Sequence, residues 1–306
     1  MKNYKNFIIE KPIRLDKYLI DNYSNVGNVL LEKAIRNKDI LVNHLKPDLK
    51  QYLEERDNLF LTDFIIKIMS NKNKVEATKN ISKQDIERFK SYTIYEDDYI
   101  FAINKPSGLA VQGGSKIEKC VADYLQGTEK LVHRLDKDTS GVLVIAKNRE
   151  NAEILTEYFK NKNEHLEKIY LAVAIGNFTK SEGEINLPLL KKVENGVEKV
   201  YVSQDGKEAK TKYRVIKYSE RLNLSLVEVQ ILTGRTHQIR VHLKEIGHPV
   251  LNDGKYGGKM ACSNEFGSKM YLHSYRLNIR DFHERDTDIK AEKPAYFKKV
   301  ERRLAN

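Results

Sequence analysis

The sequence predicts an α+β protein of two domains joined by a basic linker, and three observations support this organisation. Apolar residues recur at helical spacing over residues 13–44, and residues 66–92 are rich in Lys and Asn without a sustained period. After residue 92, strand-like apolar runs alternate with helical or loop segments. We therefore expect a small domain at 1–65, a linker at 66–92 and one larger α+β domain at 93–306.

Composition narrows the class of partner. The 306 residues include 54 Lys and Arg against 43 Asp and Glu, a formal charge of +11, which favours a polyanion such as nucleic acid. Cys120 and Cys262 have no second cysteine at metal or redox spacing, so we expect a reducing compartment and no zinc site. The chain starts without a signal-peptide core and lacks a membrane-length apolar stretch, which predicts a cytoplasmic protein without a membrane partner. The sequence leaves the oligomeric state open, and a monomer is the default expectation.

Residues 13–44 predict two short helices. Leu15, Leu19 and Ile20 begin the apolar spacing, and Val29, Leu30, Ala34 and Ile35 continue it. Two runs, "ILVN" at 40–43 and "NLFLTD" at 58–63, predict short strands. Residues 1–65 hold 11 basic and 10 acidic side chains, so a basic surface here depends on placement. Candidates for it are Arg14, Lys17, Lys33, Arg36 and Lys38.

The larger domain begins with the strand-like "YIFAI" at 99–103, followed by a loop, "NKPSGLAVQGG", at 104–114. This loop lacks the Gly-Lys-Ser/Thr ending of a phosphate-cradling loop, and the chain contains no dinucleotide-binding fingerprint. We therefore expect no nucleotide cofactor.

Residues 133–141, "HRLDKDTSG", crowd charged and hydroxyl side chains into a loop that leads into the apolar strand "VLVIA". Asp136 has Arg134 two positions before it and Asp138 two after, and Gly141 permits a tight turn. This composition suits the fixing of one carboxylate. Composition alone nevertheless favours a turn whose charges neutralise one another.

The strand "EKIYLAVAIG" at 167–176 alternates strictly, so Ile169, Leu171, Val173 and Ile175 share one face. Tyr170 lies on the other face with Ala172 and Ala174. These small neighbours leave room over the Tyr170 ring for a flat base. The alternative is a core tyrosine whose hydroxyl is satisfied.

The last cluster, "LTGRTHQIRVHLKEIGHP" at 232–249, follows the strand "SLVEVQIL" and predicts a helix with Thr236 as its N-cap and Gly247 at its end. Ile239, Leu243 and Ile246 share one helical face. On another face, His237, Arg240 and Lys244 form a cationic stripe where a phosphate or a carboxylate could bind. Because His237, His242 and His248 make no ligand pair on one face, we expect no metal.

Four segments, in this order, closely resemble the RNA pseudouridine synthases of the RluA/RluC type, over most of residues 94–280. They are "NKPSGLAVQGG", "HRLDKDTSGVLVIAK", "EKIYLAV" and "LTGRTHQIRVHLKEIGHPVLND". The first domain, through "IRLDKYL" and "LLEKAIRNKDILVN", resembles the small RNA-binding domain named after ribosomal small-subunit protein S-four. The resemblance implies the pseudouridine synthase fold, with a mixed, largely antiparallel sheet flanked by helices. It also implies cofactor-free isomerisation of uridines in RNA, with large-subunit ribosomal RNA as the expected substrate.

Residue roles follow from the same resemblance. Asp136 matches the catalytic carboxylate, and both addition to the sugar and removal of a sugar proton stay open. Tyr170 matches the tyrosine that stacks on the base and assists proton removal from the ring carbon, and Arg240 matches the basic partner of the carboxylate. Arg134 matches a residue associated with moving the nucleotide out of its stack. Further expected RNA contacts are Arg235, His237, Arg14, Lys17, Lys33 and Arg36.

The sequence departs from the related sequences at several positions, and two alternative functions stay open. Lys38 stands where the related sequences commonly have glycine, His44 and Leu45 replace a usual Gly-Lys turn, and Asn252 replaces a glycine before Asp253. One alternative is a non-catalytic RNA-binding protein that aids ribosome assembly. Another is a base hydrolase, which would need a second carboxylate to activate water; we therefore expect Asp138 to be structural.

Overall fold

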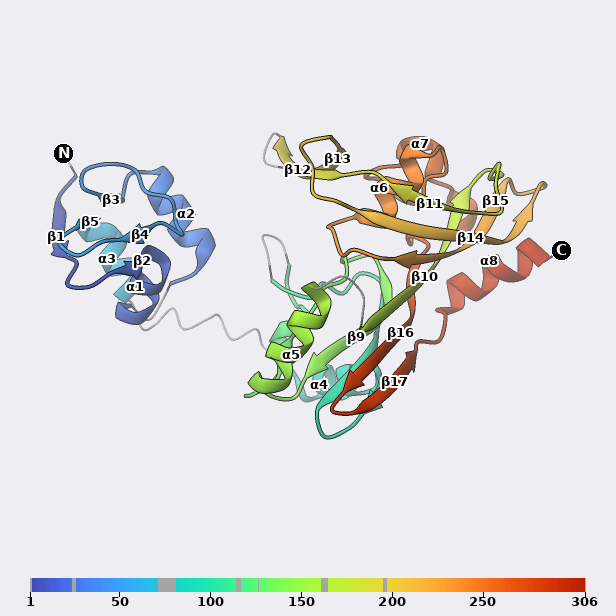
Figure 1. Ribbon diagram of the computed structural model, residues 1–306, viewed down its shortest axis with the longest axis horizontal. Coiled ribbons are helices and arrows are strands. Elements are labelled where there is room, and N and C mark those ends of the chain that lie inside the picture. Colours follow the sequence, from blue (N-terminus) through green and yellow to red (C-terminus); the bar gives the residue numbers. More distant parts are fainter. Residues whose placement is uncertain are drawn as a thin grey trace. The chain divides into compact units, whose positions relative to one another are not determined.

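The computed structural model describes residues 2–23, 26–70, 81–113, 117–125, 127–160, 165–194 and 197–305. The chain forms two compact units, Met1–Asn80 and Ile81–Asn306 (Figure 1). Both units combine helices with strands, which confirms the predicted α+β class. Within the described residues, no helix is long and apolar enough to span a membrane.

The N-terminal unit is built from short elements. Its three-stranded antiparallel sheet has the order β1 (Tyr4–Ile8), β5 (Asn58–Thr62), β3 (Ile40–Val42), and β2 (Ile13–Arg14) pairs with β4 (Tyr52–Leu53). The helices are α1 (Leu15–Asn22), α2 (Asn28–Arg36) and α3 (Asp63–Ser70). The two helices and two strands expected here are confirmed, whereas α3 was not expected.

The expected linker, residues 66–92, is shorter than the sequence suggested. Helix α3 continues to Ser70 because Ile65 and Met69 are buried in the core of the N-terminal unit. Helix α4 (Lys83–Lys90) starts at a capping box formed by Ser82 and Asp85 and buries Phe89 in the core of the second unit. Residues 71–80, the middle of the expected linker, lie outside the described residues.

Three departures from the related sequences share one backbone feature. Lys38, His44 and Asn252 have positive φ angles of 59°, 66° and 62°. Glycine reaches this left-handed region without a steric cost, which explains its use at such positions. Asn252 compensates through its side chain, which donates to the Gly267 carbonyl at 2.7 Å and the Lys269 carbonyl at 3.1 Å. It therefore holds the chain segment after α7 (Gly258–Ala261).

The second unit is organised on a ten-stranded sheet whose main path runs β11-β14-β15-β10-β16-β9-β7-β6. Strand β8 adds to β9, and β17 adds to β16. In chain order the strands are β6 (Thr93–Glu96), β7 (Ile100–Lys105), β8 (Lys130–Leu131), β9 (Ser140–Ala146), β10 (Leu166–Ile175), β11 (Glu182–Asn186), β14 (Lys210–Ser219), β15 (Leu224–Ile231), β16 (Leu272–Phe282) and β17 (Arg285–Lys290). A separate hairpin pairs β12 (Leu189–Glu194) with β13 (Val197–Val202). Among the described residues, short 3₁₀ turns cover Val121–Tyr124 and Asn264–Phe266.

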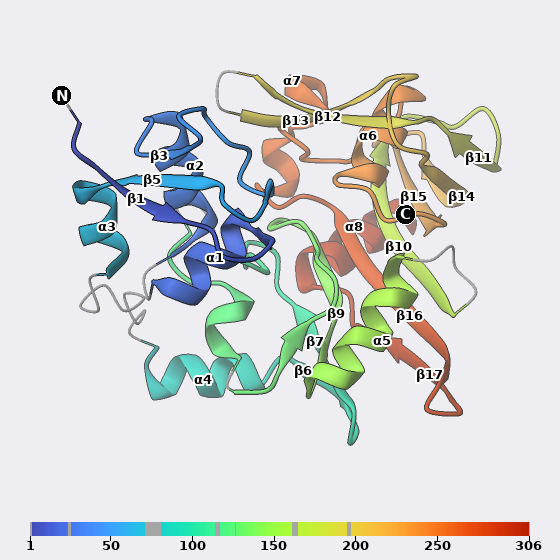
Figure 2. The ribbon, with the colours of Figure 1, turned by 60° about the vertical axis from the view of Figure 1, so that its left-hand side comes forward.

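One parallel pair makes this otherwise antiparallel sheet mixed, as predicted. Strands β9 and β16, distant in sequence, lie side by side with Gly141 opposite Ser274 (Figures 1 and 2). Gly141 has φ +109°, and a Cβ atom there would lie 2.1 Å from the Ser274 carbonyl oxygen. The glycine therefore allows the strand after the polar loop to approach β16.

Helices cover both faces of the sheet, as expected. On one face, Ile239 and Leu243 of α6 (Gln238–Glu245) pack with Phe89 of α4 in the largest core cluster. The opposite face is covered by α5 (Arg149–Lys160), through Ala152 and Leu155, and by α8 (Ala295–Ala305). The site described below lies on the α6 face.

Strand β10 follows the predicted alternation. Tyr170, Ala172 and Ala174 belong to the core cluster beneath α6, whereas Leu171 and Val173 belong to the cluster beneath α8. Tyr170 is therefore presented on the same face as the start of α6.

Candidate active site

A cleft on the α6 face collects the residues singled out in the sequence. It is lined by Tyr170 of β10 and Leu272 of β16, by four residues of the polar loop, and by the end of β15 and the start of α6. The loop residues are Arg134, Leu135, Asp136 and Thr139, and the others are Ile231 and residues 234–240. The cleft has a cavity volume of about 120 Å³ and opens to the solvent.

The polar loop is held by contacts through its own backbone. The Thr139 N–H donates to the Asp136 carbonyl at 3.1 Å, which closes a turn around Lys137. The Lys137 carbonyl accepts from the Gly108 N–H at 2.9 Å and from Lys105 Nζ at 3.1 Å. Asp136 is thus displayed from a turn fixed to the 104–109 segment.

Lys105 is a buried residue that the sequence analysis did not single out. Its Nζ also donates to the carbonyls of Pro106, at 3.1 Å, and Leu109, at 2.8 Å. Burial lowers the pKa of Lys105 to about 7, against the opposing effect of Asp138 and Asp136. The sequence signal that could have identified Lys105 is its position after an apolar, strand-like run and directly before a proline.

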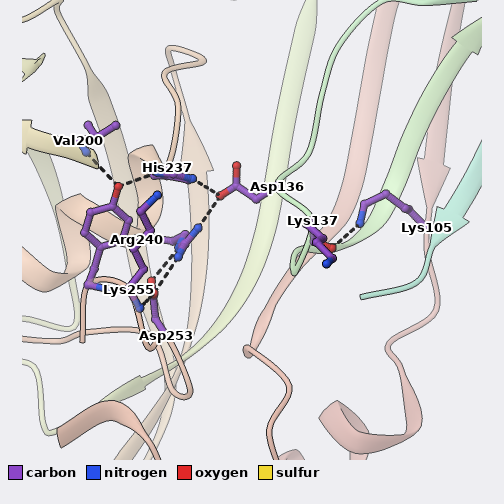
Figure 3. A network of polar contacts seen from close by, with 9 residues as sticks. Lys105, Asp136, Lys137, Val200, His237, Arg240, Asp253 and Lys255 are labelled. Atoms are coloured by element: carbon purple, nitrogen blue, oxygen red, sulfur yellow. Dashed lines mark hydrogen bonds and ion pairs between the residues drawn. The ribbon is translucent and has the colours of Figure 1, made fainter. Parts of the chain in front are cut away.

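Asp136 and Arg240 meet across the cleft, as expected from the resemblance. Arg240 Nη1 donates to Asp136 Oδ2 at 3.0 Å, and the carboxylate side chain keeps 19% of its surface exposed (Figure 3). Asp136 therefore faces the cleft while one of its oxygens is held by a charged donor.

Arg240 has a second carboxylate partner, Asp253, which the sequence analysis did not identify. Its Nε and Nη2 donate to Asp253 Oδ2 and Oδ1 at 2.7 and 2.8 Å, and the Asp253 side chain is only 1% exposed. Burial acts to lower the pKa of Arg240, but Asp253 and Asp136 together raise it above its usual value. The guanidinium is therefore permanently charged, and buried between two carboxylates.

His237 connects the same site to Tyr256. Its Nε2 lies 3.7 Å from Asp136 Oδ2 and its Nδ1 lies 2.6 Å from the Tyr256 hydroxyl, which also accepts from the Val200 N–H at 3.1 Å. Burial lowers the pKa of His237, and Arg240 adds to this effect, although Asp136 opposes it. The imidazole is thus neutral near pH 7. Both nitrogens of the His237 ring face protein groups. The expected contact of His237 with RNA is therefore left to the part of its side chain that lines the cleft.

The start of α6 differs from the prediction. The N-cap is His237, in the left-handed region at φ 54°, and not Thr236. Gln238 holds this turn, since its Oε1 accepts from the Thr233 hydroxyl at 2.8 Å and from the Arg235 N–H at 3.0 Å. The strained backbone at His237 directs its ring toward Asp136.

The cationic stripe predicted along α6 also differs from the structure. Arg240 and His237 turn inward toward Asp136, whereas Lys244 is exposed and pairs with Glu245 at 2.8 Å. The anion at this end of the helix is therefore a carboxylate of the protein. The predicted apolar face of Ile239, Leu243 and Ile246 is confirmed.

Tyr170 lines the cleft from β10. Burial raises its pKa to about 12, and Asp136 adds to this effect, whereas a hydrogen bond with the Ser274 side chain opposes it. The phenol therefore keeps its proton at neutral pH.

The expected RNA contacts are divided between the two units. Arg134 and Arg235 are exposed at the cleft, and Arg235 Nε donates to the Glu208 carbonyl at 2.9 Å. Four others belong to the N-terminal unit, where all are exposed: Arg14, Lys17, Lys33 and Arg36. Arg14 pairs with Asp16 at 2.6 Å. Asp138 is exposed and does not line the cleft.

The remaining histidines of the α6 segment have structural partners. His242 Nδ1 lies 2.9 Å from the Thr211 hydroxyl, and His248 stacks on Phe178. Among the described residues, no group of three or more His, Cys, Asp or Glu side chains could hold a metal ion.

Comparisons with known proteins found similar sequences along nearly the whole chain. Residues 99–245 match the family described as RNA pseudouridylate synthase. The chain is 38% identical to ribosomal large subunit pseudouridine synthase C of Rickettsia bellii, over 95% of this chain and 99% of the relative. It is 31% identical to the protein of the same name from Vibrio cholerae, over 94% of this chain and 91% of the relative.

A solved structure shares the fold. Human RNA pseudouridylate synthase domain containing 4 aligns with a TM-score of 0.60 and 26% identity, over 72% of this chain and 95% of the human chain. The structural match, the full-length relatives and the residues 99–245 that carry the cleft lead to one conclusion. The chain belongs to the RNA pseudouridylate synthase family, isomerases that convert uridine in RNA to pseudouridine.

Proposed function

We propose that this enzyme isomerises uridines in large-subunit ribosomal RNA and that Asp136 is its reacting carboxylate. The substrate is supported by the names of relatives that match along nearly the whole chain. A formal charge of +11 is consistent with a polyanionic substrate.

The observation that carries the role of Asp136 is its place in the cleft. Among the described lining residues, it is the only carboxylate, and the hydrogen bond from Arg240 Nη1 orients it. A hydrolase would need a second carboxylate to activate water, whereas isomerisation must retain the detached uracil. Addition to the sugar and removal of a sugar proton are both compatible with this arrangement.

Tyr170 is assigned to stacking against the uracil ring. Its pKa of about 12 keeps the phenol protonated at neutral pH, which favours a stacking surface over a base in the resting enzyme. Assistance in removing the proton from the ring carbon would require the phenol first to give up its own proton.

RNA contacts are assigned to both units. Arg134 and Arg235 at the cleft would meet the extruded nucleotide and its phosphates. In the N-terminal unit, which we infer to be an S-four-like RNA-binding domain, Arg14, Lys17, Lys33 and Arg36 would contact the RNA backbone. The monomeric state and the cytoplasmic location stay predictions.

The test is tritium release from C5 of uracil in unmodified large-subunit ribosomal RNA. We expect release by the wild type and none by Asp136→Asn, which removes the charge but keeps the shape. Asp138→Asn is the matched control, because this exposed carboxylate lies outside the cleft lining, and it should keep the wild-type rate. Equal release by Asp136→Asn would refute the assignment, and release by none of the proteins on RNA that they bind would refute the proposed substrate.

A further inference from the structure

The two oxygens of Asp136 have different surroundings. Oδ2 accepts from Arg240 Nη1 at 3.0 Å and lies 3.7 Å from His237 Nε2. No hydrogen bond reaches Oδ1 from any residue in the part of the chain that the structure describes. The donors of the site therefore converge on one oxygen and leave the other to the cleft.

Asp253 accounts for the direction of Arg240. It occupies both Nε and Nη2, at 2.7 and 2.8 Å, so only Nη1 points to Asp136 (Figure 3). Asp253 is itself fixed, since its Oδ1 accepts from the N–H groups of Lys255 at 3.1 Å and Tyr256 at 3.2 Å. With Arg240 held in this orientation, the hydrogen bond that reaches Asp136 comes from Nη1 and goes to Oδ2.

Tyr256 accounts for the direction and tautomer of His237. The phenol oxygen accepts from the Val200 N–H at 3.1 Å, so its own proton is available to His237 Nδ1 at 2.6 Å. Because Nδ1 then acts as the acceptor, the neutral ring carries its proton on Nε2, which faces Asp136 Oδ2. The Tyr256 ring also lies 5.0 Å from the Arg240 guanidinium carbon.

We propose that Asp253 and Tyr256 are positioning residues that hold Arg240 and His237 on Oδ2 of Asp136, so that Oδ1 is the oxygen that reacts with the bound nucleotide. The inference rests on the proposed role of Asp136. It applies equally to addition to the sugar and to removal of a sugar proton, because each requires one oxygen with an unengaged lone pair.

The test compares single-turnover rates, RNA affinity and thermal stability of Asp253→Asn and Tyr256→Phe. We expect Asp253→Asn to lower the rate about 100-fold, since Arg240 becomes free to engage both oxygens of Asp136. Tyr256→Phe should lower it about fivefold, the effect of losing one orienting hydrogen bond. RNA dissociation constants should stay within about twofold of the wild type, because neither residue lines the cleft.

Two matched controls remove the same groups elsewhere. Asp288→Asn removes a carboxylate paired with Arg276 at 2.6 Å, and Tyr218→Phe removes a phenol bonded to Asn223 at 3.2 Å. Both should keep the wild-type rate.

A pair of double-mutant cycles then separates positioning from general stability. Tyr256→Phe should cost nothing further when His237→Gln is already present, and Asp253→Asn nothing further beside Arg240→Met.

The outcomes separate the two proposals. If Asp136→Asn is inactive while folded Asp253→Asn and Tyr256→Phe keep the wild-type rate, the positioning role is refuted and the proposed function stands. Rate losses that are undiminished in the His237→Gln and Arg240→Met backgrounds also refute it, because the residues then act independently of these donors. An active Asp136→Asn would refute both proposals. If Asp253→Asn does not fold, Tyr256→Phe and its cycle decide the question.

Discussion

We expect His273 to make the stability of the second unit, Ile81–Asn306, depend on pH. It lies fully buried on β16, opposite Ser140 in the parallel pair that follows the polar loop. Its Nε2 donates to the Ala291 carbonyl at 3.2 Å, and its Nδ1 lies 2.9 Å from the Ser140 hydroxyl. The tautomer with the proton on Nε2 satisfies both contacts, so protonation would place a second, buried charge there.

The magnitude follows from the change in pKa. Burial lowers the pKa of His273 from 6.5 to about 4, against the opposing effect of the Ala291 carbonyl. Between these values the unfolded chain binds one proton more than the folded protein, so stability falls as pH falls from 6.5 toward 4. At pH 5 the loss relative to pH 8 is about 2 kcal/mol, or about 4–8 °C in melting temperature for a unit of this size.

The measurement is the free energy of unfolding of the wild type and of His273→Gln at pH 8, 6.5 and 5. Glutamine can still donate to the Ala291 carbonyl but does not titrate. We expect the wild type to lose about 2 kcal/mol more than His273→Gln between pH 8 and pH 5. Substitution of the partly exposed His165 by Gln is the control and should keep the wild-type dependence. Parallel pH curves for the wild type and His273→Gln would refute the reasoning.

Two further predictions concern the strand pair and the N-terminal unit. Gly141→Ala should destabilise the protein by about 3 kcal/mol or more, because its Cβ would lie 2.1 Å from the Ser274 carbonyl oxygen. Thermal melting checks this, with Gly113→Ala, which meets no atom within 4 Å, as a near-neutral control. Replacing the exposed Lys17, Lys33 and Arg36 by Ala should weaken RNA binding and reduce the slope of log affinity against log salt by about 2. An unchanged slope in filter-binding titrations would contradict an RNA-contact role.

Much of the architecture could be predicted from the sequence because it depends on local spacing. Alternation in residues 169–175 correctly separated Tyr170 from Leu171 and Val173, and helical spacing identified Ile239 and Leu243 as core residues. The linker was less predictable. Its ends looked polar in sequence, yet α3 and α4 each gain enough from burying Ile65, Met69 and Phe89 to remain helical.

The functional site was likewise predicted only in part from the sequence. Motif resemblance brought Asp136, Tyr170 and Arg240 together, and the structure gathers all three at one cleft. The resemblance did not identify Lys105, Asp253 or Tyr256 as site residues. The local sequence pattern placed the N-cap of α6 at Thr236 instead of His237. Each error concerns a side chain whose partner is remote in sequence or whose backbone is strained.

By itself, the sequence determined the class of fold and the main strands, since these follow from periodicity over short stretches, and the resemblance of its motifs indicated Asp136, Tyr170 and Arg240. Only the tertiary structure decided how Asp136 is held. Its hydrogen bond to Arg240 spans 104 positions, and the contact of Arg240 with Asp253 spans 13. Such pairings depend on which strands and loops become neighbours, and burial between them gives each charge and tautomer its role.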